Sequence, residues 1–332
     1  ETAMEIHSAW GTFEWLLTDG FPLGHRSGVV CNSDGHKGRP GASYPGAATF
    51  GAYGGLTCFL THDLTRDGIF ECLRSRHHYG TTGCRMHLEV KAHFQEQAIF
   101  YHHDPKAYRD PRTSKVREVM MGDIVETGEN EVMLSLKILA HAPLERVEIR
   151  NGSEVCSIHR PFDASDLGSR IRVIWSGAEY RGRGRQTSWK GRADFRHCRI
   201  LKMKKINAWN HEKRLQTCGT KSVEWDAVTT GNFGGFDVWL EEGDDAELDL
   251  ASNHGSLRIP LNQIGLEDHV LDAGGLERQI RVFRLPEINP HREIEHHLQI
   301  PLKPNQDNPL WVCVTTEDGF QAWSSPIFVI PS

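Results

Sequence analysis

Residues 131–139 read Glu-Val-Met-Leu-Ser-Leu-Lys-Ile-Leu, and their apolar side chains recur at every second position. Successive side chains of a β-strand point to opposite faces, so this pattern predicts a strand with one buried face. The buried positions would be Val132, Leu134, Leu136 and Ile138. Leu144 to Arg150 and Glu154 to Ile158 flank Asn151-Gly152, which is typical of two strands joined by a tight hairpin turn. The centre of the chain is therefore predicted to be β-structure.

Short apolar runs separated by turn residues continue beyond this hairpin. They predict further strands at Arg170–Trp175, Phe236–Leu240, Leu257–Leu261, Gln279–Leu285 and Leu310–Thr315, with a closing strand over 321–330. Many short strands with short connections are typical of paired sheets. Residues 91–332 are therefore predicted to form a β-rich, sandwich-like region.

The first 90 residues mix helix and strand. The pattern predicts a strand over Ala3–His7, a helix beginning at Thr12, which would cap it, and a strand over Ser27–Asn32. A loop rich in glycine and proline follows over 37–55, and loops of this length are usually functional. Apolar residues near helical spacing over Leu64–Arg76 predict a second helix, with Asp63 or Thr65 as its cap.

The composition excludes several classes of protein. Among 332 residues, 38 Lys and Arg stand against 44 Asp and Glu, so the net charge is 38 − 44 = −6. This mild acidity argues against a general nucleic-acid binder, and the apolar runs are far shorter than the ~20 residues that span a bilayer. Eight cysteines without a Cys-x-x-Cys pair are typical of reduced thiols, so we expect a cytoplasmic protein.

Asp34 and His36 follow directly after the predicted strand 27–32. In α/β barrels, catalytic groups gather at the carboxyl ends of strands. A carboxylate oxygen and an imidazole nitrogen together suit zinc, manganese or iron. The same spacing also fits a simple turn in which Asp34 caps the following backbone.

Residues 28–41, Gly-Val-Val-Cys-Asn-Ser-Asp-Gly-His-Lys-Gly-Arg-Pro-Gly, resemble the closing metal motif of the polymerase-and-histidinol-phosphatase (PHP) superfamily. They are more closely similar to a PHP-related bacterial family, domain of unknown function 3604. Residues 5–14, 64–76, 79–83 and 321–327 also resemble that family. The resemblance implies that residues 1–90 form the C-terminal part of a distorted PHP-like β/α barrel, and that 91–332 are an accessory region.

By this resemblance, Asp34 and His36 match the last two ligands of a site with two or three divalent metal ions, and both would be catalytic. The superfamily's early His-x-His pair occurs nowhere in this sequence. The resemblance therefore implies that the other ligands precede Glu1, in a missing N-terminal half or in a partner chain, so that the chain alone is an incomplete enzyme. The implied activity is metal-dependent hydrolysis, with a phosphoester as the first substrate class. We also expect a homo-oligomer.

Five further residues near this motif are candidates. Glu5 and His7 would orient a metal ligand or bind the metal, although His7 equally fits a residue that caps a strand end. Glu14 fits a carboxylate on a helix face or one that orients a ligand. Lys37 and Arg39 would bind a small anionic substrate, or belong to a solvated loop.

A basic stretch supports an alternative function. Residues 170–205 hold 12 Lys and Arg with interleaved aromatic residues, whereas 237–249 hold seven acids and no base. The alternative is a catalytically inactive barrel remnant with a β module that binds carbohydrate or a polyanion. The simpler interpretation is that the two stretches face each other across sheets or form solvated faces.

Overall fold

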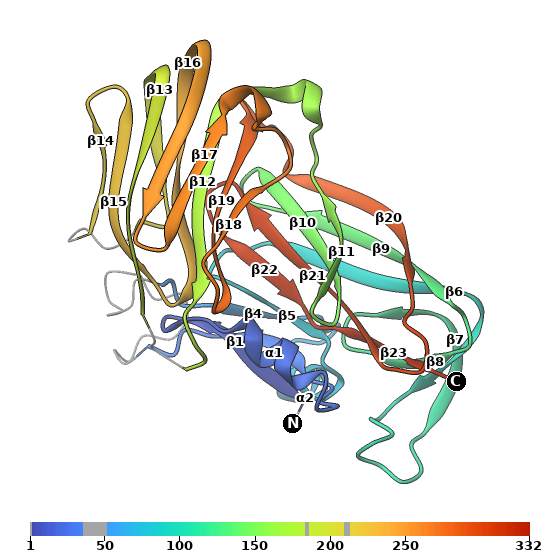
Figure 1. Cartoon of the computed structure of the whole chain (residues 1–332). Coiled ribbons are helices and arrows are strands. Elements are labelled where there is room, and N and C mark those ends of the chain that lie inside the picture. Colours follow the sequence, from blue (N-terminus) through green and yellow to red (C-terminus); the bar gives the residue numbers. More distant parts are fainter. Residues whose placement is uncertain (1, 36–51, 183–185, 209–212) are drawn as a thin grey trace.

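The computed structural model describes residues 2–35, 52–182, 186–208 and 213–332. These residues form sheets of three, twelve and eight strands, with two α-helices and two short 3-10 turns. The prediction of a mainly β chain is confirmed (Figure 1). In the part that is described, neither helix has the length and apolar character needed to cross a bilayer.

The three-stranded sheet has the order β2-β1-β3, with β1 at Ala3–Ser8, β2 at Gly11–Thr12 and β3 at Gly28–Cys31. β1 and β3 are parallel and are connected through helix α1 (Glu14–Gly20), so they form a β-α-β unit. The prediction that Thr12 caps this helix is wrong. Thr12 lies in β2, where its hydroxyl bonds to the ring of His7, and the helix begins two residues later.

Helix α2 spans Arg66–Ser75, and Thr65, one of the two predicted caps, is its N-cap residue. The Thr65 hydroxyl accepts a hydrogen bond from the Gly68 backbone N–H, which satisfies one of the free donors of the first helical turn. Arg76, with φ of 64°, ends the helix in the left-handed conformation.

The twelve-stranded sheet contains strands from both ends of the chain. Its main path is β20-β9-β6-β8-β23-β21-β22-β5-β4, to which β7, β10 and β11 are attached. The early strands are β4 (Leu56–Phe59), β5 (His78–Thr81), β6 (His87–Tyr101), β7 (Thr113–Met120), β8 (Ile124–Thr127), β9 (Glu131–Leu139), β10 (Leu144–Asn151) and β11 (Glu154–His159). The late strands are β20 (Glu293–Pro301), β21 (Asn308–Thr316), β22 (Gln321–Ser324) and β23 (Ile327–Pro331). Residue 90, the predicted domain boundary, lies inside β6.

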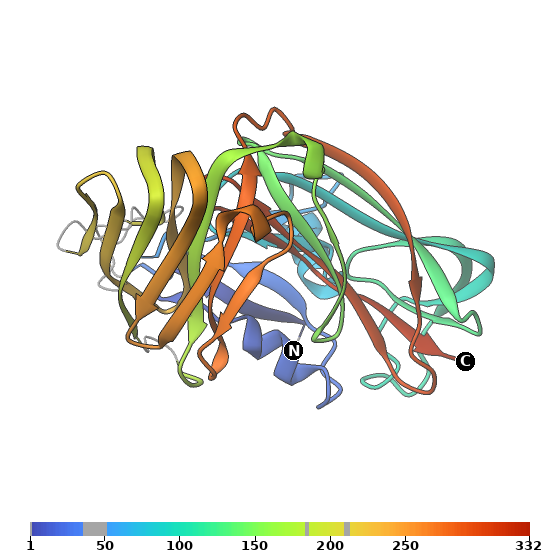
Figure 2. The same ribbon diagram turned by 45° about the horizontal axis from the view of Figure 1, so that its top comes forward.

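The eight-stranded sheet is inserted between β11 and β20, and its strands lie side by side on one flank of the molecule (Figure 2). The order is β14-β15-β13-β16-β12-β19-β18, with β17 paired to β16. The strands are β12 (Leu167–Ala178), β13 (Thr187–Ile206), β14 (Arg214–Cys218), β15 (Ser222–Thr229), β16 (Gly231–Ser252), β17 (Gly255–Pro260), β18 (His269–Asp272) and β19 (Leu276–Pro286). The 3-10 turns lie at Ala164–Asp166 and Leu261–Gln263.

Two predicted strands differ in extent from those observed. The segment 236–240 is only part of β16, a strand of 22 residues that exceeds the usual strand length. The closing segment 321–330 is two strands, because the chain changes neighbours at Ser325-Pro326. β22 pairs with β21 and β5, whereas β23 pairs with β21 and runs parallel to β8.

Each large sheet has its own apolar core. Leu134, Leu136 and Ile138 of β9 are fully buried in the core of the twelve-stranded sheet, as their alternation predicts. Trp189 and Phe195 of β13 lie in the core of the eight-stranded sheet. A third, smaller core joins the β-α-β unit to the larger sheet. Its members are Ile6, Leu17, Val29, Cys31, Trp311, Cys313 and Trp323.

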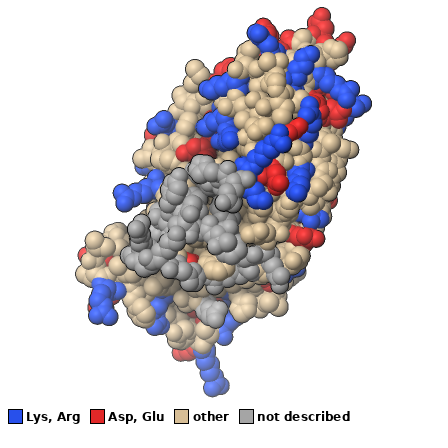
Figure 3. Space-filling model, turned by 90° about the vertical axis from the view of Figure 1, so that its left-hand side faces the viewer, with Lys and Arg blue, Asp and Glu red and all other residues tan. Residues whose placement is uncertain are grey.

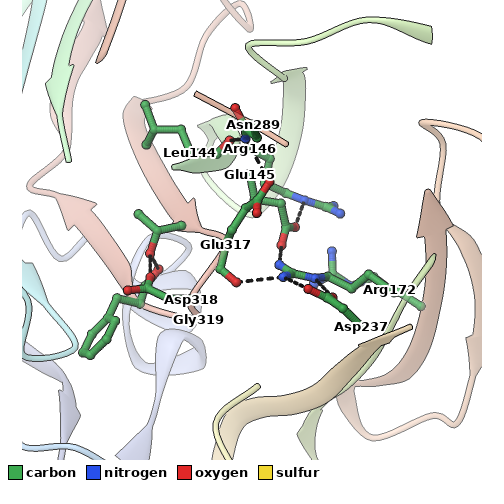
Figure 4. Close-up of polar contacts among 12 residues, drawn as sticks. Leu144, Glu145, Arg146, Arg172, Asp237, Asn289, Glu317, Asp318 and Gly319 are labelled. Carbon is green, nitrogen blue, oxygen red and sulfur yellow. Dashed lines mark hydrogen bonds and ion pairs between the residues drawn. The ribbon is translucent and has the colours of Figure 1, made fainter. Parts of the chain in front are cut away.

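Charged side chains connect the two large sheets (Figure 4). Arg172 of β12 binds Asp237 of β16 with both Nε and Nη2, at 2.6 and 2.8 Å. Its Nη1 forms an ion pair with Glu145 of β10 in the other sheet. Arg170 bridges Asp237 and Glu317, the latter at 2.6 Å. These side chains are almost completely excluded from solvent, so each charge depends on its partners.

Two glycines allow the β-α-β unit to approach the eight-stranded sheet. The Thr12 backbone N–H donates to the Thr230 carbonyl at 3.0 Å. A Cβ at Gly11 would lie 2.0 Å from the Thr230 carbonyl oxygen, and one at Gly231 would lie 1.9 Å from the Thr12 carbonyl oxygen. Both glycines have positive φ, so side chains are excluded here by space and by backbone conformation.

Candidate functional site

Asp34 lies just beyond the carboxyl end of β3. Because β1 and β3 are parallel, this end lies beside the carboxyl end of β1, which carries His7. The Asp34 carbonyl accepts a hydrogen bond from Trp10 Nε1 at 3.2 Å, and the Ala9 N–H donates to the Ser33 carbonyl at the same distance. Asp34 has φ of 45°, a conformation that Asp tolerates better than most residues, and its Oδ2 is shielded from solvent. The segment after β3 is thus held against the one after β1.

Three predicted site residues, His36, Lys37 and Arg39, lie outside the described residues. Their predicted roles as metal ligand and substrate-binding cations stay predictions. Asp34 is the part of the motif that the structure places.

Glu5 contacts the same segment from β1. Its Oε2 accepts a hydrogen bond from Asn32 Nδ2 at 2.8 Å, two residues before Asp34. The pairing of β1 with β3 shifts register between Glu5 and His7. Glu5 therefore bonds to the chain that leads into the motif, while His7 makes other contacts.

His7 is buried, and both of its ring nitrogens are used. Nε2 donates to the Tyr53 carbonyl at 2.9 Å, and Nδ1 lies 2.9 Å from the Thr12 hydroxyl, from which it accepts in the neutral ring. The ring also stacks on Trp323. Burial lowers the pKa of His7 to about 4, so the ring is neutral at pH 7. In this arrangement neither nitrogen is left to bind a metal ion, and the ring braces the end of β1.

The donor set fits a transition metal only in part. The carboxylate of Asp34 is an oxygen donor of the kind that such metals bind, and Glu5 lies one hydrogen bond from the same segment. Within residues 2–35, 52–182, 186–208 and 213–332, no group of three His, Cys, Asp or Glu side chains is arranged to hold a metal ion. The burial of the Cys31 thiol raises its pKa and keeps it protonated, so it does not add a thiolate ligand.

Glu14 lies away from this motif, in a cleft between the three sheets. Its Oε1 accepts a hydrogen bond from Trp323 Nε1, and its Oε2 lies 3.4 Å from Arg150 Nη1. Burial raises the pKa of the Glu14 carboxyl, against the opposing effect of Arg150, while Glu277 raises it further.

The cleft has a volume of about 310 Å³, near the lower end of the range for small-molecule sites. Its walls come from α1, β10, β12, β16, β19, β21 and the start of β22. Sequence reasoning identified Glu14 alone among its residues. Trp15 fits the pattern of a helix face and Arg150 that of a strand. Neither local pattern indicates that these two distant segments lie close together in the fold.

The described part of the basic stretch 170–205 lies mainly on β12 and β13 of the eight-stranded sheet. Three of its aromatic side chains, Trp175, Trp189 and Phe195, are buried in the core, where they cannot stack on a ligand, whereas Tyr180 is 50% exposed. The interpretation that the basic and acidic stretches face each other across sheets is wrong in one respect. β16, which carries the acidic residues, lies between β12 and β13 in a single sheet.

Lateral ion pairs connect these strands. Arg196 of β13 binds Asp249 of β16 at 2.5 Å, and Arg199 binds Glu241 at 2.8 Å. On the face that carries these strands, Lys and Arg are interspersed with Asp and Glu (Figure 3). The charges therefore neutralise one another locally, as expected for exposed faces of a sheet.

Comparison with known proteins gives no match: no family model matches the chain, and neither the search of curated proteins nor that of solved structures finds a similar one.

Proposed function

We propose that this chain supplies the closing strands and two ligands, Asp34 and His36, of a metal-dependent hydrolase related to the PHP superfamily. In this proposal, β1, α1 and β3 are the end of a distorted β/α barrel, and the two large sheets are an accessory region. The substrate class is a phosphoester, and the metal ions are zinc, manganese or iron.

One observation carries the proposal: a parallel β-α-β unit ends in Asp34. Parallel strands joined by a helix are the building unit of β/α barrels, whose catalytic groups follow the carboxyl ends of strands. Trp10, Ala9 and Glu5 bond to the segment 32–34 and fix its course, which a ligand-bearing segment requires.

Each residue of this chain has a distinct role in the proposal. Asp34 and His36 hold the metal, and Glu5 orients the segment through Asn32. His7 braces the carboxyl end of β1 through Thr12 and does not bind the metal. Lys37 and Arg39 bind the anionic oxygens of the substrate, for which an Arg side chain offers paired donors. A bound divalent metal supplies Lewis-acid chemistry that polarises a phosphoester.

Asp34 and His36 are too few ligands for a transition-metal site, which takes four or more. The proposal therefore draws the remaining ligands from residues other than 1–332, either in the same protein or in a partner chain. All eight cysteines are free thiols, which agrees with the proposed cytoplasmic location.

Metal content tests this proposal. The native protein, purified from its source, is measured by elemental analysis and intact mass beside the double variant Asp34→Ala, His36→Ala. We expect one or more equivalents of zinc, manganese or iron in the native protein and their loss in the variant, because two ligands are removed. Turnover of 4-nitrophenyl phosphate and of bis(4-nitrophenyl) phosphate then separates monoester from diester hydrolysis.

A matched control is offered by His62 and Asp63, an adjacent, exposed pair of the same residue types before α2. The variant His62→Ala, Asp63→Ala should keep its metal. A native protein without metal, or a double variant at 34 and 36 that keeps it, would overturn the proposal.

A further inference from the structure

The cleft that contains Glu14 lies where the three sheets meet, and Asp34 does not line it. α1 contributes Glu14 and Trp15, β10 contributes Arg150, and β12 and β19 contribute Ser176 and Gln279. Clefts between separately built parts of a protein are common binding sites for small molecules.

The arginines that line the cleft are paired with acidic side chains of the protein. Arg150 binds Glu148 at 2.5 Å through Nη2, and Glu148 in turn is held ionised by that pair, with its pKa lowered although burial opposes this. Arg181 binds both carboxylate oxygens of Asp19, at 2.5 and 2.7 Å. Arg281 binds Asp268 at 3.1 Å. A phosphate or carboxylate entering the cleft would therefore compete with acidic side chains for every arginine that lines it.

Neutral polar groups in the cleft are available to a ligand. Ser176 and Gln279 lie directly opposite each other on β12 and β19. Among the described residues, neither side chain makes a hydrogen bond to the protein, so a hydroxyl and an amide remain as donors and acceptors.

An aromatic surface accompanies these polar groups. Trp15 is half-buried in the cleft wall, and the guanidinium of Arg181 lies 6.0 Å from its ring centre. Arg181 pairs in turn with Asp19, and both of these side chains are partly exposed. A sugar ring has C–H groups on its faces and hydroxyls around its edge. It therefore packs on an indole while its hydroxyls exchange hydrogen bonds with amide, hydroxyl and paired charged groups.

We propose that this cleft binds a neutral carbohydrate of one or two rings, with Trp15 against a ring face and Ser176 and Gln279 bonded to ring hydroxyls. This site goes beyond the proposed metal-dependent activity and uses none of its residues.

Saturation-transfer NMR tests the proposal on the full chain, in EDTA so that no metal contributes. The probes are methyl glucoside, maltose, cellobiose, lactose and N,N′-diacetylchitobiose, with glucose 6-phosphate and glucuronate as anionic comparisons. We expect saturation of at least one neutral sugar at millimolar concentration and weaker saturation of both anions. No saturation of any neutral sugar, or tighter binding of an anion, would overturn the proposal.

Variants locate the bound sugar. Trp15→Ala and Gln279→Ala should each weaken binding of the saturated sugar at least about tenfold. Trp239→Ala is the matched control, because Trp239 is also partly exposed on the eight-stranded sheet but does not line the cleft. It should bind like the wild type, and circular dichroism identifies any variant that has not folded. Unchanged binding in folded Trp15→Ala and Gln279→Ala proteins would show that the sugar binds elsewhere and would overturn the proposal.

Discussion

The two faces of β12 are equally buried, but one is apolar and the other carries two arginines beside the apolar Ile174. Ile171, Val173 and Trp175 point into the apolar core of the eight-stranded sheet. Arg170 and Arg172 point to the other side, where acidic residues of both large sheets surround them. All five residues are at most 3% exposed.

This difference shows what each face contributes. Apolar contacts are non-directional, so the core face stabilises the sheet without fixing one orientation precisely. The charged face needs each guanidinium opposite its carboxylates, because an unpaired buried charge is costly. We infer that the apolar face holds the inserted sheet together, while the charged face determines how it sits on the twelve-stranded sheet.

Removing one charge should have the largest effect. Arg172→Leu leaves Asp237 and Glu145 buried with fewer cationic partners, so we expect the free energy of unfolding to fall by about 3–5 kcal/mol. Urea denaturation measures this value. Arg199→Leu is the matched control, since Arg199 pairs with Glu241 on the exposed surface and should change stability by less than about 1 kcal/mol. Equal effects of the two variants would contradict the difference between buried and exposed pairs.

Acidification should have the next largest effect on stability, and different groups should be protonated in two pH ranges. Burial lowers the pKa of His7 and of His78 to about 4, from 6.5. The unfolded chain then binds more protons than the folded one between these values, so stability is complete above pH 6.5 and falls towards pH 4. Each histidine should lower the free energy of unfolding by about 2 kcal/mol at pH 5, compared with neutral pH.

The charged face of β12 should respond only below this window. Although burial opposes it, Arg172 and Arg170 lower the pKa of Asp237, so its stabilising contribution is present above its ordinary value near 4 and is lost below it. Urea midpoints at pH 7, 5.5, 4.5 and about 3 test this order. The variant His7→Gln should show a shallower fall than the wild type, and an equally steep fall would exclude His7 as a cause.

A small change on the apolar face should have the smallest effect. Ile171→Val removes one buried methylene group and should lower the free energy of unfolding by about 1 kcal/mol. Ile158→Val, at a position that is 49% exposed, is the control and should change it by less than about 0.5 kcal/mol. A loss at Ile171 as large as that at Arg172 would show that the apolar face, too, depends on precise fit.

Local patterns predicted those elements whose environment is local. The strand over 131–139, the hairpin of β10 and β11 and the cap at Thr65 agree with the structure, because alternation, turn chemistry and capping act over a few residues. The hairpin turn is Gly152-Ser153, one residue later than predicted, since Asn151 pairs with Glu154. The 22-residue extent of β16 could not be predicted in this way, since its acidic half resembles a solvated loop until the neighbouring arginines are placed beside it. From the sequence, Arg170 and Arg172 are likewise expected to face solvent, although β10 covers them in the structure.

The two candidate sites differ in the same way: one has a local sequence signal and the other does not. Asp34 was predicted because it follows an apolar strand, a signal contained in six residues. The cleft could not be predicted, because Glu14, Arg150 and Gln279 are separated by more than a hundred residues each and meet only through the arrangement of three sheets. The contacts of His7 with Thr12 and Tyr53 also depend on that arrangement.

The pairing of Leu167 with Pro286 has a consequence for the order of folding. Leu167 is the first residue of β12 and Pro286 is the last residue of β19. The two ends of the inserted segment 167–286 therefore lie side by side. Once β12 and β19 have paired, the inserted segment 167–286 acts as a short connection between β11 and β20. The entropic cost of closing this long loop has then already been met by the pairing of β12 with β19 when β20 pairs with β9. The topology therefore favours a folding route in which the inserted sheet forms before the twelve-stranded sheet is complete.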